Sequence, residues 1–187
     1  MAVPVGVRDL FYAILEKDDN TSITYKKPVR MAKAIEVKIS PSTEQEVLYA
    51  DDSPSEVANT FGECSMEINC DDLTIETQAQ LLGHTIVNGV LKKNKDDLAP
   101  YVAVGFRSIK SNKKYRYFWM LKGKFSLPKQ ELKTQEGSPE FQTPTIEGSF
   151  LPRDFDGNWQ FAGDEDSPEF TQGATWFNEV VADKPKE

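Results

Sequence analysis

The stretch GECSMEINCDD, residues 62–72, alternates between apolar and polar side chains almost without a fault. Cys64, Met66, Ile68 and Cys70 occupy every second position. A period of two is typical of a β-strand that has one face in a core and the other in water. The stretch therefore predicts a half-buried strand whose dry face contains two thiols. Its wet face carries three carboxylates: Glu63, Glu67 and Asp71.

The two cysteines are expected to be free thiols. Six residues of one strand separate Cys64 from Cys70 by roughly 20 Å, whereas a disulfide needs Cα atoms within about 7 Å. The chain has a single histidine, so a Cys/His zinc site lacks ligands. We therefore predict no metal and no cofactor, and we interpret the thiols as small core residues in a reducing compartment.

Length and charge narrow the class of protein. The 187 residues suit about one domain, and a hydrophobic fraction of 39% suffices for a core. Thirty acidic residues against 22 basic ones give a formal charge of -8, the wrong sign for a protein that neutralises phosphates. The start MAVPVGVRDLF has no apolar core of a signal peptide, and no apolar run approaches ~20 residues. We expect a soluble chain that is not exported and has no membrane partner.

Alternating apolar runs predict a chain built mainly of strands. A turn at 110–113 joins two of them into a hairpin, and Asp156-Gly157-Asn158 turns the chain into residues 159–161 as a second hairpin. Residues 51–61, which contain Pro54, are predicted to be a polar loop, and Pro144 places its strand at an edge or a bulge. The predicted strands are 10–15, 34–40, 46–50, 62–72, 101–109, 114–125 and 141–151.

Two helices are expected. Residues 74–82 are favoured because Thr74 can cap the first turn and Gly83 can close the last one. The spacing of Trp176, Phe177 and the two following valines predicts a short helix over 174–182. Many strands and one firm helix favour a β-sandwich or barrel with a flanking helix. We assign residues 1–162 to this domain and 163–187 to an acidic extension.

The sequence contains no arrangement of residues that is typical of an enzyme active site. His84 follows Gly83, where an imidazole can meet the last helix carbonyls, and no Ser or Cys partner is implied. Glycines are scattered, so no phosphate-binding loop is indicated. Residues 154–165 share some spacing with a calcium loop, but Trp159 stands where glycine is required, and a hairpin turn fits better. We therefore predict a protein that is not an enzyme.

The segment 107–124 contains seven basic residues and no acidic one, interleaved with aromatics. One interpretation is a stacking platform for single-stranded nucleic acid. The other is a core strand, because Tyr115, Tyr117, Trp119 and Leu121 share one face, with a basic edge that meets the acidic face of another copy. The candidate contact residues on this edge are Arg107, Lys113 and Lys114.

Several separated blocks together resemble the major tail proteins of siphophages, especially phages of Gram-positive bacteria. The likeness covers roughly residues 6–162. The blocks are LYADDSPSEVAN (48–59), LLGHTI (81–86), APYVAVGFRSIKSNKKYRYFWMLKGKF (99–125) and EFQTPTIEGSF (140–150), and ATWFNEV (174–180) is a looser match.

This resemblance implies a structural virion protein: a tail-tube-like β-sandwich or barrel that self-assembles into stacked six-membered rings. Their inner strands join around a channel that conducts genomic DNA without binding it specifically. The implied partners are further copies of the chain, the tape measure protein, and the tail terminator and tail tip proteins. The implied location is the virion tail, after assembly in the bacterial cytoplasm. A nucleic-acid-binding β module and a head decoration protein remain open as alternatives.

The residues suggest where such a protein makes its contacts. Carboxylates that face a channel repel phosphates, so a genome can slide. The candidates for lining the channel are Glu63, Glu67 and Asp71, and, on neighbouring strands, Glu36 and Glu147. Contact between rings is expected from the loop at 51–61, the segment 127–140 and the C-terminal piece. The candidate contact residues there are Tyr49, Asp51, Asp52, Pro54, Glu56, Trp176 and Phe177.

Overall fold

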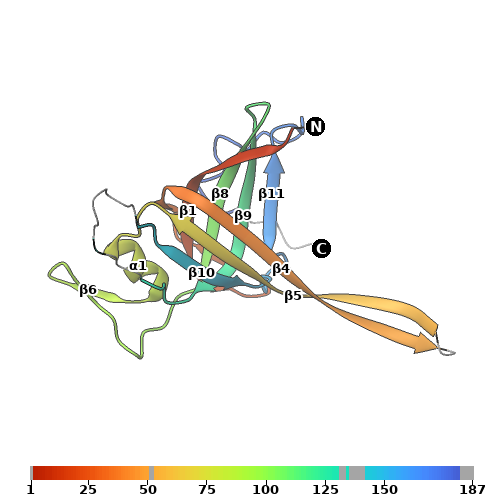
Figure 1. Cartoon of the computed structure of the whole chain (residues 1–187), viewed down its shortest axis with the longest axis horizontal. Coiled ribbons are helices and arrows are strands. Elements are labelled where there is room, and N and C mark those ends of the chain that lie inside the picture. The colour runs from red at the N-terminus through yellow and green to blue at the C-terminus, as the bar shows by residue number, and fades with distance from the viewer. Residues whose placement is uncertain (1, 51–52, 131–133, 135–141, 182–187) are drawn as a thin grey trace.

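The computed structural model describes residues 2–50, 53–130, 134 and 142–181, with the backbone alone for 46–50 and 53–58. The chain is mainly β (Figure 1). Its strands are β1 (Pro4–Asp18), β2 (Ile23–Tyr25), β3 (Val29–Ala32), β4 (Ala34–Ala50), β5 (Ser53–Cys70), β6 (Thr85–Val87), β7 (Val90–Lys92), β8 (Val102–Lys110), β9 (Tyr115–Phe125), β10 (Thr145–Phe150) and β11 (Gln160–Asp164). The helix is α1 (Ile75–Leu82), which is too short to cross a membrane, and no other described helix could do so.

Nine of the described strands form one antiparallel sheet, and β6 with β7 forms a separate ribbon. The main order is β2-β1-β8-β9-β10-β5-β4, with β3 paired to β1 and β11 paired to β9. The sheet curls so that β4 and β5 pass over β1, β8 and β9 (Figure 1). Its ends at β2 and β4 stay apart in the hydrogen-bonding order, so the described residues do not form a closed barrel, one of the two architectures expected.

The predicted half-buried strand is confirmed as the inner part of β5. Cys64, Met66, Ile68 and Cys70 are at most 1% exposed and lie inside the curl. Both cysteines are free thiols. Burial raises the pKa of each thiol, and for Cys70, with Asp71 and Asp72 nearby, raises it to about 11. These thiols are therefore poor nucleophiles in the folded protein.

The sheet buries apolar side chains on both faces. The larger cluster fills the inside of the curl and combines residues of β1, β5, β8, β9, β10 and α1, such as Leu10, Met120 and Phe150. A smaller cluster lies on the opposite face of β1, β8 and β9 around Trp119 and Leu121. Trp176 and Val180, from the C-terminal segment, cover this second cluster.

The predicted helix and its caps are confirmed. The Thr74 hydroxyl accepts a hydrogen bond from the Thr77 N–H at 3.3 Å. Gly83 ends the helix with φ 74°, and a Cβ at this position would meet the Leu98 carbonyl oxygen at 2.2 Å. Glycine is thus required here by both backbone conformation and close approach. The predicted hairpin of β8 and β9 is also confirmed, with its turn after Lys110.

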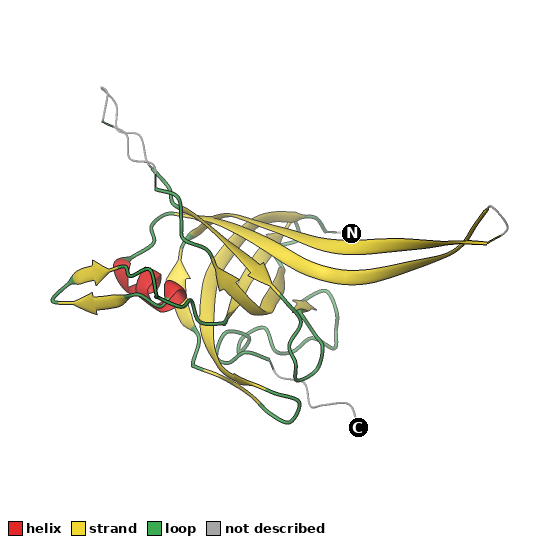
Figure 2. Cartoon of the chain, turned by 90° about the horizontal axis from the view of Figure 1, so that it is seen from below, coloured by secondary structure: helices red, strands yellow, loops and turns green. Residues whose placement is uncertain are grey.

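The predicted polar loop over residues 51–61 is wrong. β4 runs without a break from Ala34 to Ala50, and β5 pairs with it from Ser53 onward; residues 51 and 52 lie outside the described part. Figures 1 and 2 show the two strands leaving the body together. We call residues 44–50 and 53–60 the arm. The predicted strand over residues 46–50 is confirmed as the end of β4, whereas residues 53–61, predicted as loop, belong to the strand that pairs with it.

The second predicted hairpin is also wrong. β11 pairs with β9 instead of with the preceding strand β10. β10 pairs with residues 123–125 at the end of β9, and β11 pairs with residues 116–120 of the same strand. The intervening chain makes an excursion and returns to the same edge. Pro144, expected at an edge or a bulge, precedes β10, which lies between β5 and β9.

The expected helix over 174–182 is not formed in the described residues, which end at 181. Residues 173–178 form consecutive turns, with N–H groups of Thr175 and Asn178 bonded to carbonyls three residues earlier. The assigned boundary at residue 162 falls inside β11.

Candidate assembly surfaces

Three of the five candidate channel residues meet on one face of the sheet. The outward positions of β4, β5 and β10 form this polar face, with Glu147 paired in register to Glu67 and Lys38 paired to Glu67 from the other side. Glu36 lies two positions from Lys38 on β4. Lys38, Glu67, Glu147 and neighbouring serines border a shallow depression of about 260 Å³.

The polar face is not purely acidic, because Lys38 lies among its carboxylates. The Lys38 Nζ lies 2.9 Å from Glu67 Oε1 and 3.4 Å from Glu36 Oε2. The hydrogen bond to Glu67 and the charges of both glutamates raise the pKa of Lys38. Lys124, exposed and paired in register to Ser149, adds a second cation. Glu36 and Lys38 occupy alternate positions of the predicted strand 34–40, so the sequence pattern puts both on the same face.

The remaining two candidates differ from each other. Glu63 is exposed on the outward side of β5. Asp71 follows the end of β5, and its carboxylate accepts the N–H groups of Lys33 and Asp72, each at 2.9 Å. The Lys33 hydrogen bond lowers the pKa of Asp71. Asp71 therefore holds the connection between β3 and β4 against the end of β5.

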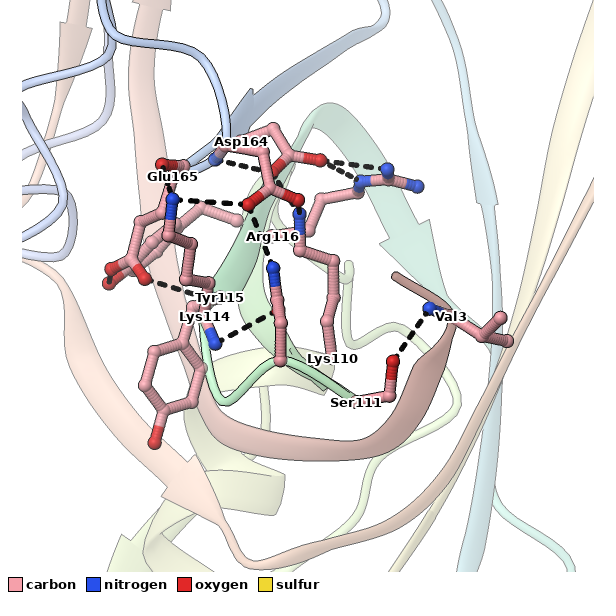
Figure 3. A network of polar contacts seen from close by, with 11 residues as sticks. Val3, Lys110, Ser111, Lys114, Tyr115, Arg116, Asp164 and Glu165 are labelled. Carbon is pink, nitrogen blue, oxygen red and sulfur yellow. Dashed lines mark hydrogen bonds and ion pairs between the residues drawn. The ribbon is translucent and has the colours of Figure 1, made fainter. Parts of the chain in front are cut away.

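The basic hairpin tip is neutralised within its own chain. Figure 3 shows Lys110, Lys114 and Arg116 gathered around the segment that begins at Asp164. The Lys110 ammonium, whose side chain is 1% exposed, contacts both Asp164 and Asp166. Arg116 pairs with Asp164 at 2.7 Å, and Lys114 pairs with Asp166 at 3.2 Å.

Two further basic residues of the segment 107–124 also pair with carboxylates of the same chain. Lys122 lies 2.7 Å from both Asp18 and Asp154. Arg107 pairs with Asp9 at 2.6 Å and lies over the Tyr115 ring at 4.2 Å. Five of the seven basic residues thus pair with carboxylates of the same chain. Lys113 is exposed in the turn.

Tyr115, Tyr117 and Trp119 share one face of this hairpin, as predicted, and the C-terminal segment covers that face. Tyr117 and Trp119 are at most 2% exposed. The Trp119 Nε1–H donates to the Trp176 carbonyl at 3.0 Å, and the Phe177 ring stacks on Phe11 at 4.7 Å. Trp176 and Phe177, expected at a contact between subunits, therefore lie against the sheet of their own chain. Bases have no access to the buried rings.

The arm contains the remaining contact candidates. Tyr49 pairs in register with Pro54, and Leu48 pairs with Glu56; Asp51 and Asp52 lie outside the described residues, as does most of the segment 127–140. β4 ends the sheet order, and β5 pairs with β10 only over residues 64–69. In the described chain the arm therefore has a free backbone edge on each side.

His84 takes a different partner from the expected helix carbonyls. Its Nδ1 lies 2.6 Å from Asp97 Oδ2, and its buried Nε2 has no hydrogen-bond partner among the described residues. Asp97 also accepts the Asn94 N–H at 2.8 Å, so the pair fixes the loop after β7 to the end of α1. No group of three or more potential metal ligands occurs in the described residues.

Comparison with known proteins adds no assignment to these surfaces: no protein-family model and no curated protein matches the chain.

Proposed function

We propose that this protein is a tail tube subunit of a siphophage, which self-assembles into stacked six-membered rings and conducts DNA into the host. The sequence blocks described above provide the resemblance. The structural observation that supports the proposal most strongly is the arm. From the pair Thr43–Phe61 to the pair Ala50–Ser53 it reaches roughly 23 Å beyond the body, at ~3.3 Å per residue.

A projecting arm of this kind requires a partner. An isolated two-stranded ribbon is marginally stable in water, and free strand edges readily pair with another chain. Proteins normally protect such edges, so a long exposed ribbon favours a protein that assembles through it. In the proposed ring, the curled sheet acts as a tail-tube-type sandwich or barrel, and sheet edges of neighbouring copies join.

The polar face is our candidate for the channel wall. Four carboxylates, on Glu36, Glu63, Glu67 and Glu147, stand there against two ammonium groups, with serines between them. Such a surface presents little positive charge to phosphates, so DNA passes without counterion release. The ion pairs of segment 107–124 speak against the alternative of a nucleic-acid-binding hairpin, because its charges are already compensated.

Shortening the arm tests the proposal. Replacing residues 46–58 by Asn-Gly joins Gln45 to Asn59, which are partners in register, through a two-residue hairpin turn. We expect concentrated wild-type protein to form rings or hollow tubes in negative-stain electron microscopy. The shortened variant should keep the wild-type circular dichroism spectrum and melting temperature yet remain monomeric. Phe61, which packs against the core, and the core residues that follow it on β5 are retained in this variant.

A second variant serves as the matched control. Replacing residues 46–58 by an equally long Gly/Ser segment preserves chain length and removes strand-forming residues, and it should also fail to polymerise. Normal tubes from the Asn-Gly variant would contradict the role of the arm. Isolated wild-type particles at every concentration, together with virion shafts that lack this chain, would contradict the proposed function itself.

A further inference from the structure

An open groove of about 750 Å³ lies beside the end of α1, at the end of the molecule away from the arm (Figure 1). Ligand sites in proteins typically measure about 300–1,000 Å³ and combine an apolar lining with a few polar groups. This groove has both: an apolar part from α1 and from the end of β9, and a polar part from the loop after β7. Its lining includes Leu82, His84, Lys93, Lys95, Phe125 and Leu127.

His84 contributes a polar atom without a partner to this lining. Its side chain is 3% exposed, and its Nδ1 lies 2.6 Å from Asp97 Oδ2. A carboxylate accepts hydrogen bonds, so Nδ1 carries the hydrogen and Nε2 of the neutral ring presents a lone pair. Nε2 is buried, and no described residue donates to it. A buried acceptor without a donor costs free energy, so it favours a ligand that brings an N–H or O–H group.

Three lysines in and beside the groove carry uncompensated charge. Lys92, Lys93 and Lys95 are exposed, and none of them forms an ion pair with a described residue. Most basic residues of the hairpin of β8 and β9, in contrast, are paired. Asp96, an exposed carboxylate of the same loop, offsets only one of the three charges. The loop therefore favours an anionic ligand.

The groove also presents apolar surface. Leu82 and Phe125, both at most 4% exposed, form its buried base. Leu127 at its border is 68% exposed, and Leu98, which stands between two lining residues in the sequence, is 83% exposed. Uncovered leucines next to a groove are typical of a binding site, so the ligand should carry an apolar group beside its charge.

The groove is held in shape by its own chain. Asp97 Oδ2, which contacts the imidazole, also accepts the Asn94 N–H at 2.8 Å. The backbone of Leu98 lies so close to Gly83 that a Cβ there would meet its carbonyl oxygen. The loop after β7 is thus fixed to the end of α1 at two points. A groove that is already formed loses little conformational entropy when a ligand binds.

We infer that this groove binds an extended acidic segment of another protein. A backbone N–H of the segment donates to His84 Nε2, and its carboxylates contact Lys93 and Lys95. An apolar side chain of the segment packs between Leu82 and Leu127. A peptide brings all three groups within a few residues, and it is extended because the N–H groups inside a helix are already bonded.

Other ligands satisfy fewer of these groups. A free carboxylate supplies charge but no N–H donor, and a nucleic acid meets a chain whose formal charge is -8. The acidic segment after β11 of the same chain is held by Lys110 and Lys114. The inference concerns a surface to which the tube proposal gives no role, and it does not depend on that proposal.

Titration with a defined peptide tests the site. The probe is the fluorescently labelled peptide Gly-Glu-Leu-Asp-Leu-Glu-Gly, and its control is Gly-Gln-Leu-Asn-Leu-Gln-Gly, which has the same leucines and no carboxylate. We expect dilute protein to bind the acidic peptide at least about tenfold more tightly, measured by fluorescence anisotropy. K93E/K95E should weaken this binding by about tenfold or more. K27E/K113E, which changes the charge equally at exposed lysines elsewhere, should stay within about twofold of wild type.

The single histidine of the chain reports directly on Nε2. In ¹⁵N NMR spectra of the wild type, the Nε2 signal should move as the acidic peptide is added. His84→Asn keeps a donor to Asp97 in place of Nδ1 and removes the Nε2 acceptor, so it should weaken peptide binding by about fivefold or more. The melting temperature of each variant shows that it is folded.

Several results would overturn the inference. They are absence of binding at millimolar acidic peptide, equal binding of the control peptide, an Nε2 signal that does not move at saturation, and an equal loss in K27E/K113E. Tighter binding of hexanoate or of a ten-nucleotide oligothymidylate would assign the groove to a free carboxylate or to nucleic acid instead. None of these results bears on the tube proposal, which the arm variants test.

Discussion

Arg153 illustrates how single residues hold this chain together. Its side chain is completely buried, contacts the Asp156 carboxylate, and donates to the Val181 carbonyl at 3.2 Å. Burial raises the pKa of Asp156, but hydrogen bonds from Arg153 and Asn158 lower it by more, so the pKa of Asp156 lies below its ordinary value. The pair connects the turn after β10 to the C-terminal segment.

We expect Asp156→Asn to lower the free energy of unfolding by about 3 kcal/mol, because it leaves a buried guanidinium without its counter-charge. Urea unfolding near neutral pH measures this loss. The folded-state pKa of Asp156 is depressed, so its contribution is complete above about pH 4 and falls as the pH drops further. The difference between wild type and variant should therefore shrink with acid. Asp96→Asn, at an exposed position, is the control, and equal unfolding midpoints for all three proteins would refute the role of the pair.

At the scale of elements, the sequence predicted the strands that have a buried face. β5 alternates because one of its faces lies in the core, whereas β8 and β9 contain apolar residues on both faces because both faces are covered. Thr74 and Gly83 mark the two ends of α1. In the arm, residues 46–50 were predicted as strand, but residues 53–60, with two serines and Pro54, have the composition of a loop and gave no such signal. The pairing of β11 with β9 was equally hidden, since the strand pattern contains no information about which edge the chain returns to.

The C-terminal segment shows why helical spacing misleads. Trp176, Phe177, Val180 and Val181 recur at three to four residues because they touch one sheet face, and consecutive turns satisfy that requirement as well as a helix does. The segment lies flat on the sheet: a Cβ at Gly163 would meet the Phe170 ring at 2.1 Å. It is thus part of the folded body.

Trp176→Ala is expected to destabilise the monomer by about 3 kcal/mol or more, because it opens the cover of Trp119. The exposed position Asn178→Ala should change stability by at most about 0.5 kcal/mol. Thermal unfolding of dilute monomer measures both. If Trp176→Ala lowered polymerisation without lowering monomer stability, Trp176 would belong to a contact between subunits.

At the scale of the whole molecule, the basic and acidic segments seen in the sequence meet largely within one chain. Segment 107–124 is basic and the remainder is acidic, which is typical of complementary copies. Folding brings Asp9, Asp18, Asp154, Asp164 and Asp166 to these cations within one chain. Because the partners are 32 to 104 residues apart, local patterns cannot reveal them. The grouping of Glu36, Glu67 and Glu147 followed from alternation, but its register with Lys38 did not.

Reversing the charge of the polar face tests the proposal that this face lines a channel. Glu63, Glu67 and Glu147 changed together to Lys should still permit tubes but slow DNA ejection, because cations facing the channel attract phosphates. Asp71 is left unchanged because it holds the end of β5. The control converts Glu16, Glu169 and Glu179, which are exposed elsewhere, to Lys. Ejection rates that match in the two variants would place the polar face outside the channel.

The arm also has a geometric consequence. A two-stranded ribbon is strongly twisted, so each further residue pair moves its tip outward and rotates it at once. Reach and angular offset cannot be tuned separately in such a link. A filament joined by these ribbons would inherit both its spacing and its helical pitch from one number, the count of residue pairs between Thr43 and Ala50.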